Sequence, residues 1–165
     1  MKVTSKVWKF NRDDINTDEI RRSIYSSLPL EEQAKRCLET LDPTFASKVS
    51  RGDVIVAGKN FGAGSSRPAH ATILALGIAG IIAESFGRVF FRNSISGGLL
   101  VMPCPGILQA VESGEHIEAD TESGVIKNLS TGKEVIGPPL PPFLRKMVEC
   151  GGEKPYLKLR LAGAA

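Results

Sequence analysis

The stretch between residues 53 and 83 constrains the fold more than any other part of this sequence. Val54-Ile55-Val56-Ala57-Gly58 is a short β-branched run of the kind that is buried on both faces of a sheet. Pro68 opens a predicted helix that runs to about Leu76, because proline is favoured in the first helical turn, where its missing N–H would have no partner. Gly80-Ile81-Ile82-Ala83 predicts a second buried strand. Strand, helix and strand within about 30 residues predict a βαβ unit, with two parallel strands and a right-handed crossover.

Further elements are predicted on both sides of this unit. Residues 3–10 carry apolar side chains among polar neighbours and predict a first strand. Residues 11–29 are polar and irregular and predict a loop, and loops of that length are usually functional or disordered. The other expected elements are a helix at about 30–41, a short helix at 84–93, a strand at 99–102, hairpins over 114–136 and a last helix from about Pro141 to Cys150. The sequence shows no internal repeat, so residues 1–165 predict a single α/β domain with a parallel βαβ core.

The composition excludes several classes of function. The formal net charge of +3 comes from 21 basic and 18 acidic residues spread along the chain, whereas nucleic-acid binding needs basic residues clustered on one face. The three cysteines, Cys37, Cys104 and Cys150, lie far apart and fit buried, inert thiols in a reducing cytoplasm. The sequence contains no Cys-x-x-Cys or Cys/His spacing, so we expect this chain to hold neither zinc nor an iron–sulfur cluster unaided.

The sequence also gives no membrane signal. The first residues are not followed by the apolar run of a signal peptide. The longest uncharged stretches, 68–83 and 93–111, are broken by glycine or proline, and a membrane span needs about 20 mainly apolar residues. Both stretches therefore predict buried core, and we expect a cytoplasmic protein that does not enter a membrane.

The turn between the two predicted strands carries the residues most suited to chemistry. Glycines in Gly62-Ala63-Gly64 allow the backbone to approach a ligand closely, and the N-terminus of the following helix supplies unpaired N–H groups. Ser65 and Ser66 add hydroxyls, and Arg67 adds a fork that matches a carboxylate. Together they predict an anion site at the carboxyl end of a parallel strand, where ligands of open α/β sheets usually bind.

Spacing alone leaves two interpretations of this turn open. The Gly-Lys-Ser/Thr ending of a phosphate-binding loop is absent, and Arg67 stands where a dinucleotide fingerprint has its third glycine. The turn is then either a functional anion site or a structural one, in which a serine caps the helix and the arginine lies on the surface. A self-contained serine hydrolase is excluded, because Ser65 is not in a Gly-x-Ser-x-Gly elbow.

Four ordered blocks give the turn a family context. Asn60-Phe61-Gly62-Ala63-Gly64-Ser65-Ser66-Arg67 resembles the signature of the aconitase swivel-domain family, which includes the separate small subunits of isopropylmalate isomerase and homoaconitase. Three further blocks match in the same order: Asp14-Ile15-Asn16-Thr17-Asp18, then residues 51–58, then residues 83–93. The resemblance covers about residues 5–150, and four blocks in order are far more specific than one glycine-rich turn.

The resemblance implies a fold, a reaction and a partner. The fold is a swivelling β/β/α domain in three layers, and the reaction is that of a hydro-lyase acting on a hydroxy-dicarboxylate such as 3-isopropylmalate. A separate large subunit holds a [4Fe–4S] cluster, which makes this chain the cofactor-free small subunit of a heteromer. Ser65 matches the serine whose alkoxide removes a proton, and Ser66, Arg67 and Gly64 match the group that binds a substrate carboxylate. Asp18 matches an aspartate that supports proton transfer.

Chemistry agrees with the role implied for Ser65. A serine hydroxyl is too weak an acid to act as a base in water without help. N–H donors and a nearby positive charge can stabilise its alkoxide, and a helix N-terminus beside Arg67 would provide both.

A segment after Asp18 bears on the choice of substrate. In the family, the specificity residues occupy the positions of Tyr25, Ser26, Ser27 and Leu28, and homoaconitases place an arginine where this chain has Ser27. A third carboxylate there would meet hydroxyls and no charge, which poorly offsets its desolvation. We therefore expect a substrate with two carboxylates and a small or apolar third group, unless Arg21 or Arg22 supplies the charge from another angle.

Several alternatives remain at this stage. The enzyme could instead be homoaconitase-like or a methylated-malate dehydratase, taking a di- or tricarboxylate, or the chain could be a non-catalytic anion-binding domain. The family usually follows the arginine of the signature with Glu, whereas this chain has Pro68-Ala69-His70, and His70 fits a helix face better than a catalytic role. Arg88 and Arg92 lie one helical turn apart and could reach the active site, the partner subunit or a structural salt bridge.

Overall fold

One long strand, β1 (Lys2–Phe10), is shared by two differently built halves of the sheet. The computed structural model describes residues 1–64 and 67–163. Within them the strands form a seven-stranded sheet in the order β4-β3-β2-β1-β5-β6-β7. Residues 7–10 of β1 pair in parallel with β2 (Val54–Ala57), and residues 2–6 pair antiparallel with β5 (His116–Asp120).

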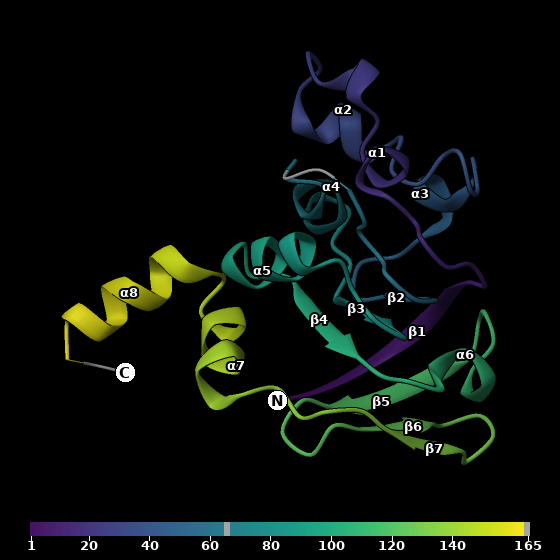
Figure 1. Ribbon diagram of the computed structural model, residues 1–165, viewed down its shortest axis with the longest axis vertical. Coiled ribbons are helices and arrows are strands. Elements are labelled where there is room, and N and C mark those ends of the chain that lie inside the picture. The colour runs from purple at the N-terminus through teal and green to yellow at the C-terminus, as the bar shows by residue number, and fades with distance from the viewer. Residues whose placement is uncertain (65–66, 164–165) are drawn as a thin grey trace.

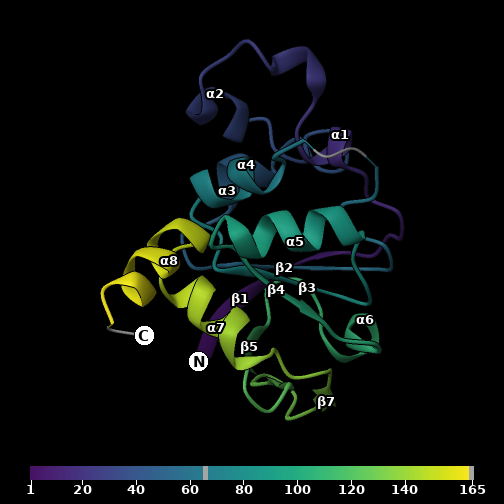
Figure 2. The ribbon, with the colours of Figure 1, turned by 60° about the vertical axis from the view of Figure 1, so that its left-hand side comes forward.

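The parallel half contains the predicted βαβ unit. β2 pairs in parallel with β3 (Gly80–Ala83), and α4 (His70–Ala75) lies between them in the chain. A second such unit follows, because α5 (Arg88–Ser96) connects β3 to the parallel strand β4 (Leu100–Pro103). In Figures 1 and 2, α4 and α5 lie on one side of these strands.

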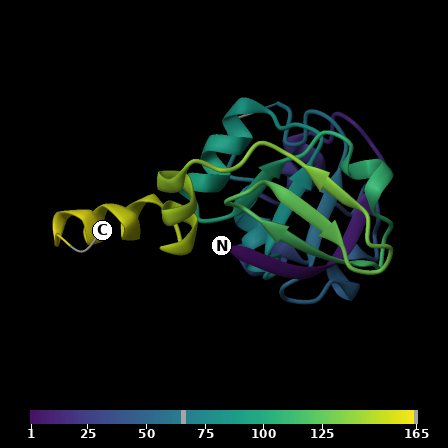
Figure 3. The ribbon, with the colours of Figure 1, turned by 90° about the horizontal axis from the view of Figure 1, so that it is seen from below.

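The antiparallel half closes the other face of the parallel strands. It consists of β5, β6 (Val125–Asn128) and β7 (Glu134–Ile136), paired in chain order, and Figure 3 shows these strands crossing over the parallel ones. The short helix α6 (Ile107–Ala110), which the sequence analysis did not predict, leads from β4 toward this half. The predicted hairpins over 114–136 are confirmed.

Two apolar clusters separate three layers, because side chains alternate across each parallel strand. Ile55, Ile81 and Val101 face the helices and pack with Ile73 and Ile95, among others. On the opposite face a second cluster joins the two halves of the sheet, and its members include Val7, Val54, Val56, Ile82, Met102, Ile117, Ala119 and Ile126. The expected β/β/α class of fold is therefore confirmed.

The segment expected as a helix at 30–41 is helical only at its start. α2 (Leu30–Ala34) ends early, and Leu38 has a left-handed backbone with φ of 57°. Leu38 is fully buried, and its N–H donates to the carbonyl of Ile20 at 3.3 Å. Burial of Leu38 in the core therefore overrides the helical pattern, and the chain turns before α3 (Phe45–Lys48).

Helix starts differ from the predictions elsewhere in this region. The expected loop at 11–29 contains α1 (Thr17–Ile20) and a 3₁₀ turn (Ser23–Tyr25). The helix expected from Pro68 begins two residues later, at His70. The helix expected at 84–93 corresponds to α5, which begins only at Arg88. Residues 84–87 form a loop instead, and this loop pairs with the turn after β2.

The C-terminal region has one helix more than predicted. α7 (Pro142–Glu149) lies close to its expected bounds, but it is not the last helix, since α8 (Glu153–Leu161) follows Gly152. α8 projects away from the rest of the molecule in Figures 1 and 3. Within residues 1–64 and 67–163, no helix has the length and apolar character needed to cross a membrane.

Candidate active site

Three loops meet where the parallel strands β1, β2 and β3 end. The turn after β2 lies between the other two, with isolated bridges joining Asn16 to Ala63 and Phe61 to Phe86. The N–H of Gly62 donates to the carbonyl of Ile15 at 2.7 Å, and the N–H of Thr17 donates to the carbonyl of Ala63 at 2.9 Å. Segments about 46 residues apart in the chain are thereby held in register, at the edge where the sequence predicted an anion site.

Glycines in this turn are required for two different reasons. Gly62 has φ of 77°, and a Cβ there would lie 2.1 Å from Cγ of Phe90, so only glycine fits against that ring. Gly64 has φ of 103°, but a Cβ there would meet only Oγ1 of Thr17, at 3.5 Å. Gly64 is therefore needed for its backbone conformation, while Gly62 anchors the turn on the aromatic core.

A capping box fixes the start of α1. Oδ1 of Asn16 accepts from the N–H groups of Asp18 at 2.9 Å and Glu19 at 3.0 Å. The Glu19 carboxylate accepts in return from the N–H of Asn16 at 3.0 Å and pairs with Arg12 at 2.7 Å. This helix was not predicted from the sequence, although the Asn-x-x-Glu spacing is typical of such a helix start.

Asp18 and Arg67, predicted as site residues 49 positions apart, lie in direct contact. Nη1 of Arg67 donates to Oδ1 of Asp18 at 2.8 Å, and the N–H of Ser23 donates to the same oxygen at 2.8 Å. The hydrogen bonds from Ser23, followed by those from Arg67, lower the pKa of Asp18 below its ordinary value. Both side chains are about half exposed, and such pairs contribute only about 0–1 kcal/mol to stability, so the pair matters mainly for orientation.

A cavity of about 370 Å³ opens beside this pair. Its wall consists of Arg21, Arg22, Ser23, Ser26, Arg67 and Pro68. Of the expected specificity residues, Ser26 lines the cavity, whereas Ser27 is exposed outside its wall. The guanidinium groups of Arg22 and Arg36 lie over the ring of Tyr25, at 5.8 and 4.7 Å from its centroid.

Arg21, in the cavity wall, is held only by neutral acceptors among the described residues. Its Nε donates to the amide oxygen of Gln33, its Nη1 lies 3.4 Å from the carbonyl of Pro68, and both acceptors are neutral. Gln33 is buried and also donates to the carbonyl of Leu28 at 2.6 Å, which ties the specificity segment to Arg21. No carboxylate of residues 1–64 or 67–163 forms an ion pair with Arg21. From the sequence, Arg21 was only one of two arginines that could supply a charge to the substrate. Its position in the cavity wall could not be predicted, because it depends on the turn after α1 and on the contact with Gln33.

His70 lies behind the cavity, within the electrostatic reach of Arg21. Burial and, secondarily, the charge of Arg21 lower the pKa of His70. A Cβ on Gly97 would lie 2.6 Å from the imidazole ring, so the ring packs against the end of α5. This placement agrees with the expected helix-face role for His70.

Two expected site residues, Ser65 and Ser66, lie outside the described residues. Among the described ones, no group of three or more His, Cys, Asp or Glu side chains could hold a metal ion. Burial raises the pKa of Cys37 to about 12 and that of Cys104 to about 11. These two thiols therefore stay protonated at neutral pH.

Comparison with known proteins decides the family. Residues 3–105 match the aconitase C-terminal domain. The chain belongs to this family. The 3-isopropylmalate dehydratase small subunit of Heliobacterium modesticaldum is 42% identical over 164 residues, which cover 98% of each chain. The isopropylmalate/citramalate isomerase small subunit of Methanocaldococcus jannaschii is 44% identical over 97% of this chain and 96% of that one.

A solved structure extends the comparison to three dimensions. The crystal structure of 3-isopropylmalate dehydratase from Methanocaldococcus jannaschii matches with a TM-score of 0.89 at 35% identity, covering 98% of this chain and 96% of that one. The resemblance inferred from the four sequence blocks is confirmed. In this aconitase-family chain, residues 62–64 and Arg67 lie beside the Asp14–Asp18 block that also carried the resemblance.

Proposed function

We propose that this chain is the small subunit of a heteromeric iron–sulfur hydro-lyase of the 3-isopropylmalate dehydratase type. The observation that carries the proposal is the contact between Asp18 and Arg67 at the mouth of the cationic cavity, directly beside the 62–64 turn. The relatives named above support it, since both are small subunits by name and both align with nearly the whole chain.

Each site residue has a distinct proposed role. Ser65 acts as the base that removes a proton from the carbon next to a carboxylate, while Ser66, Gly64 and Arg67 bind a substrate carboxylate. The resemblance implied that Asp18 supports proton transfer; we propose instead that Asp18 remains ionised, because its pKa is lowered, and holds the guanidinium of Arg67 in place. The cluster of the partner subunit would supply Lewis-acid chemistry at the leaving hydroxyl.

The proposed substrate is a hydroxy-dicarboxylate such as 3-isopropylmalate. The relatives' names favour it, and Ser23 and Ser26 offer hydroxyls rather than charge to the third substituent. Arg21 and Arg22 line the same cavity, so a tricarboxylate is the competing choice. Arg22 is partly neutralised by Glu39 at 3.3 Å, which leaves Arg21 as the stronger attraction for an extra carboxylate.

A substrate panel tests this proposal. Steady-state kinetics of the chain reconstituted with its large subunit would compare isopropylmalate, dimethylmalate, citrate and homocitrate. We expect the highest kcat/KM with a dicarboxylate. A tricarboxylate that equals or exceeds the best dicarboxylate would contradict the expected preference and would identify Arg21 as the counter-charge. An Arg21→Gln variant would then lose the tricarboxylate activity selectively.

A further inference from the structure

A second cavity, mainly apolar in its floor, lies on the other side of the active-site turn. It has a volume of about 400 Å³ and is lined by Ser85, Phe86, Arg88, Phe91, Arg92 and Pro103; we call it the α5 pocket. Its residues follow β3, belong to α5 or end β4, so it opens at the same carboxyl edge of the sheet as the active-site turn. None of the residues proposed for catalysis or substrate binding lines it.

The α5 pocket carries two exposed arginines one helical turn apart. Arg88 and Arg92 are exposed and lie four residues apart on α5, a spacing at which like charges repel each other. Arg88 is also the first residue of α5, where the helix dipole disfavours a cation. Within residues 1–64 and 67–163, neither arginine forms an ion pair. A carboxylate from outside this part of the chain would relieve both unfavourable effects.

The nearby acid Glu84 is already engaged. Its carboxylate accepts from the N–H of Gly106 at 2.8 Å and from the N–H of Leu108 at 3.2 Å. Glu84 therefore holds the loop before α6 and forms no ion pair with Arg88, which stands four residues later. Glu84 therefore does not neutralise the positive charge at the rim of the pocket.

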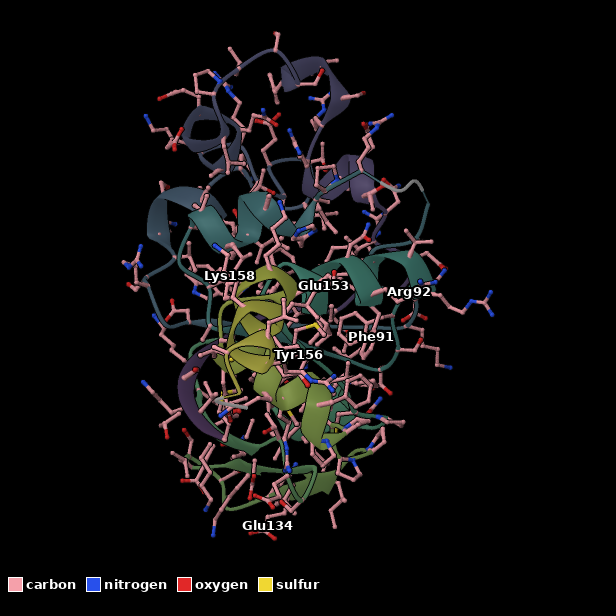
Figure 4. All side chains as sticks on the ribbon, turned by 90° about the vertical axis from the view of Figure 1, so that its left-hand side faces the viewer. Phe91, Arg92, Glu134, Glu153, Tyr156 and Lys158 are labelled. Atoms are coloured by element: carbon pink, nitrogen blue, oxygen red, sulfur yellow. The ribbon has the colours of Figure 1, made fainter. Side chains whose placement is uncertain are left out.

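The floor of the α5 pocket is preformed. Phe86 and Phe91 are half-buried, with ring centroids 6.0 Å apart, and Phe86 also stacks on the buried ring of Phe90 at 6.4 Å. Val89, on the same helix, is 45% exposed, and Figure 4 shows Phe91 between α5 and α7. Aromatic residues, phenylalanine included, and arginines are enriched at protein–protein interfaces relative to the rest of the surface.

The α5 pocket and the active-site turn are mechanically one unit. The N–H of Gly87, the residue before α5, donates to the carbonyl of Phe61 at 2.9 Å, and Phe61 in turn packs on Phe90 at 5.4 Å. A partner that covers the turn to complete the active site must therefore also meet the start of α5. This continuity, together with the charge of the rim, indicates which protein occupies the pocket.

We propose that the α5 pocket is the docking site for the large, cluster-bearing subunit, which inserts an apolar side chain flanked by carboxylates. The inference rests on the proposed function and adds to it the surface and the chemistry of the partner. The apolar side chain packs on Phe86 and Phe91, and the carboxylates pair with Arg88 and Arg92. Docking here would position the partner over the active-site turn.

Charge reversal tests the proposal with the full chain and the large subunit that copurifies with it. We expect Arg88→Glu/Arg92→Glu to weaken binding of the large subunit by about 30-fold or more, as expected for charge pairs disrupted in an interface. At saturating large subunit, kcat should equal that of the unmodified pair. Arg88→Lys/Arg92→Lys, which keeps both charges, should restore most of the affinity, and a Lys127→Glu/Lys133→Glu control makes the same change of charge on the β6–β7 hairpin.

The outcomes separate this inference from the proposed function. Unchanged affinity of the reversed variant, or an equal loss in the hairpin control, would overturn the docking site while leaving the two-subunit enzyme intact. Failure of the unmodified chain to bind any large subunit would overturn both. If the reversed variant does not fold by circular dichroism, Arg88→Gln/Arg92→Gln removes the charges with less repulsion, and unchanged affinity of that variant would likewise overturn the inference.

Discussion

The two halves of the sheet differ in how their loops are held. At the carboxyl edge of the parallel half, distant segments bond to one another: Asn60 donates to Asp14 at 2.7 Å, and the N–H of Lys59 donates to Asp13 at 2.7 Å. In the antiparallel half the turn between β6 and β7 closes locally, because Asn128 accepts from the N–H groups of Ser130 and Thr131. The loops that carry the residues proposed for chemistry are thus held by bonds between distant segments, whereas the turn between β6 and β7 is held by its own residues.

Replacing Ser65 should have the largest effect on kcat and would test whether the chemistry belongs to the parallel half of the sheet. We expect Ser65→Ala to lower kcat of the reconstituted enzyme by about 10²–10⁴-fold, because a lost general base typically costs that much. Folding and substrate binding should be nearly unchanged, since the base acts only in the chemical step. Single-turnover kinetics with a binding assay would measure both, and a variant that keeps more than about a tenth of the turnover would rule Ser65 out as the base.

Arg67 should come next in size. Arg67→Lys keeps the charge but loses the fork, so we expect kcat/KM to fall by roughly 10- to 150-fold, about 1.5–3 kcal/mol. Steady-state kinetics on the reconstituted pair would measure the change. A loss in kcat/KM no larger than that of Arg145→Lys, on α7, would show that Arg67 does not bind substrate.

A matched pair of asparagine variants tests the contrast between the halves directly. Asn16→Ala removes the cap of α1, which typically costs about 0.5–2 kcal/mol, and should also lower kcat/KM because Asp18 and Arg67 lose their fixed geometry. Asn128→Ala removes a buried side chain that donates to the carbonyl of Ala110 at 2.9 Å, and should cost about 1–3 kcal/mol in unfolding free energy. Its kcat/KM should not change.

Denaturant unfolding and kinetics on both asparagine variants would check this contrast. Loss of kcat/KM in Asn128→Ala, measured below its unfolding transition, would break the distinction between the two halves. Full activity in Asn16→Ala would also contradict the distinction, because it would show that the cap of α1 does not support the site.

The smallest expected effect on kcat/KM is that of replacing Asp18, whose charge depends on pH. Because the pKa of Asp18 is lowered from 3.8, its ionised form stabilises the folded chain above that pH, and this contribution is lost as the pH falls through the lowered pKa. At neutral pH Asp18 should then only position Arg67. We expect Asp18→Asn to lower kcat/KM by less than about fivefold, since exposed pairs contribute about 0.2–1 kcal/mol. The midpoints of its pH–rate profile should not move, and a shifted midpoint would instead indicate a proton-transfer role.

The sequence predicted the parallel core well because burial leaves a clear pattern there. β2 and β3 are β-branched runs buried on both faces, and they lie within a residue of their predicted ends. The early end of the helix expected at 30–41 was not predicted, because the left-handed backbone of Leu38 depends on packing with segments far away in the chain. α8 was missed because its leucines do not gather on one helical face: Leu157 and Leu159 are two positions apart, with charged residues between and around them.

The candidate site was less predictable than the parallel core, because only the part that carries the family resemblance could be assigned from the sequence. Through the family resemblance the sequence blocks assigned Asp18 and Arg67 to one site, but their direct contact, across 49 positions of the chain, was not predicted. Arg21 in the cavity wall and the α5 pocket required coordinates, because each combines side chains whose neighbours come from separate loops. Local sequence patterns carry no information about such neighbours.

The most direct measurement of the central claim is an activity assay on the separated and recombined subunits. The purified chain alone, its large subunit alone and their mixture would be assayed for reversible dehydration of isopropylmalate. We predict activity only in the mixture, rising with added chain until the subunits are equimolar, because the base and the arginine belong to one subunit and the Lewis acid to the other. Dehydratase activity from this chain alone, after metal has been stripped, would contradict the account.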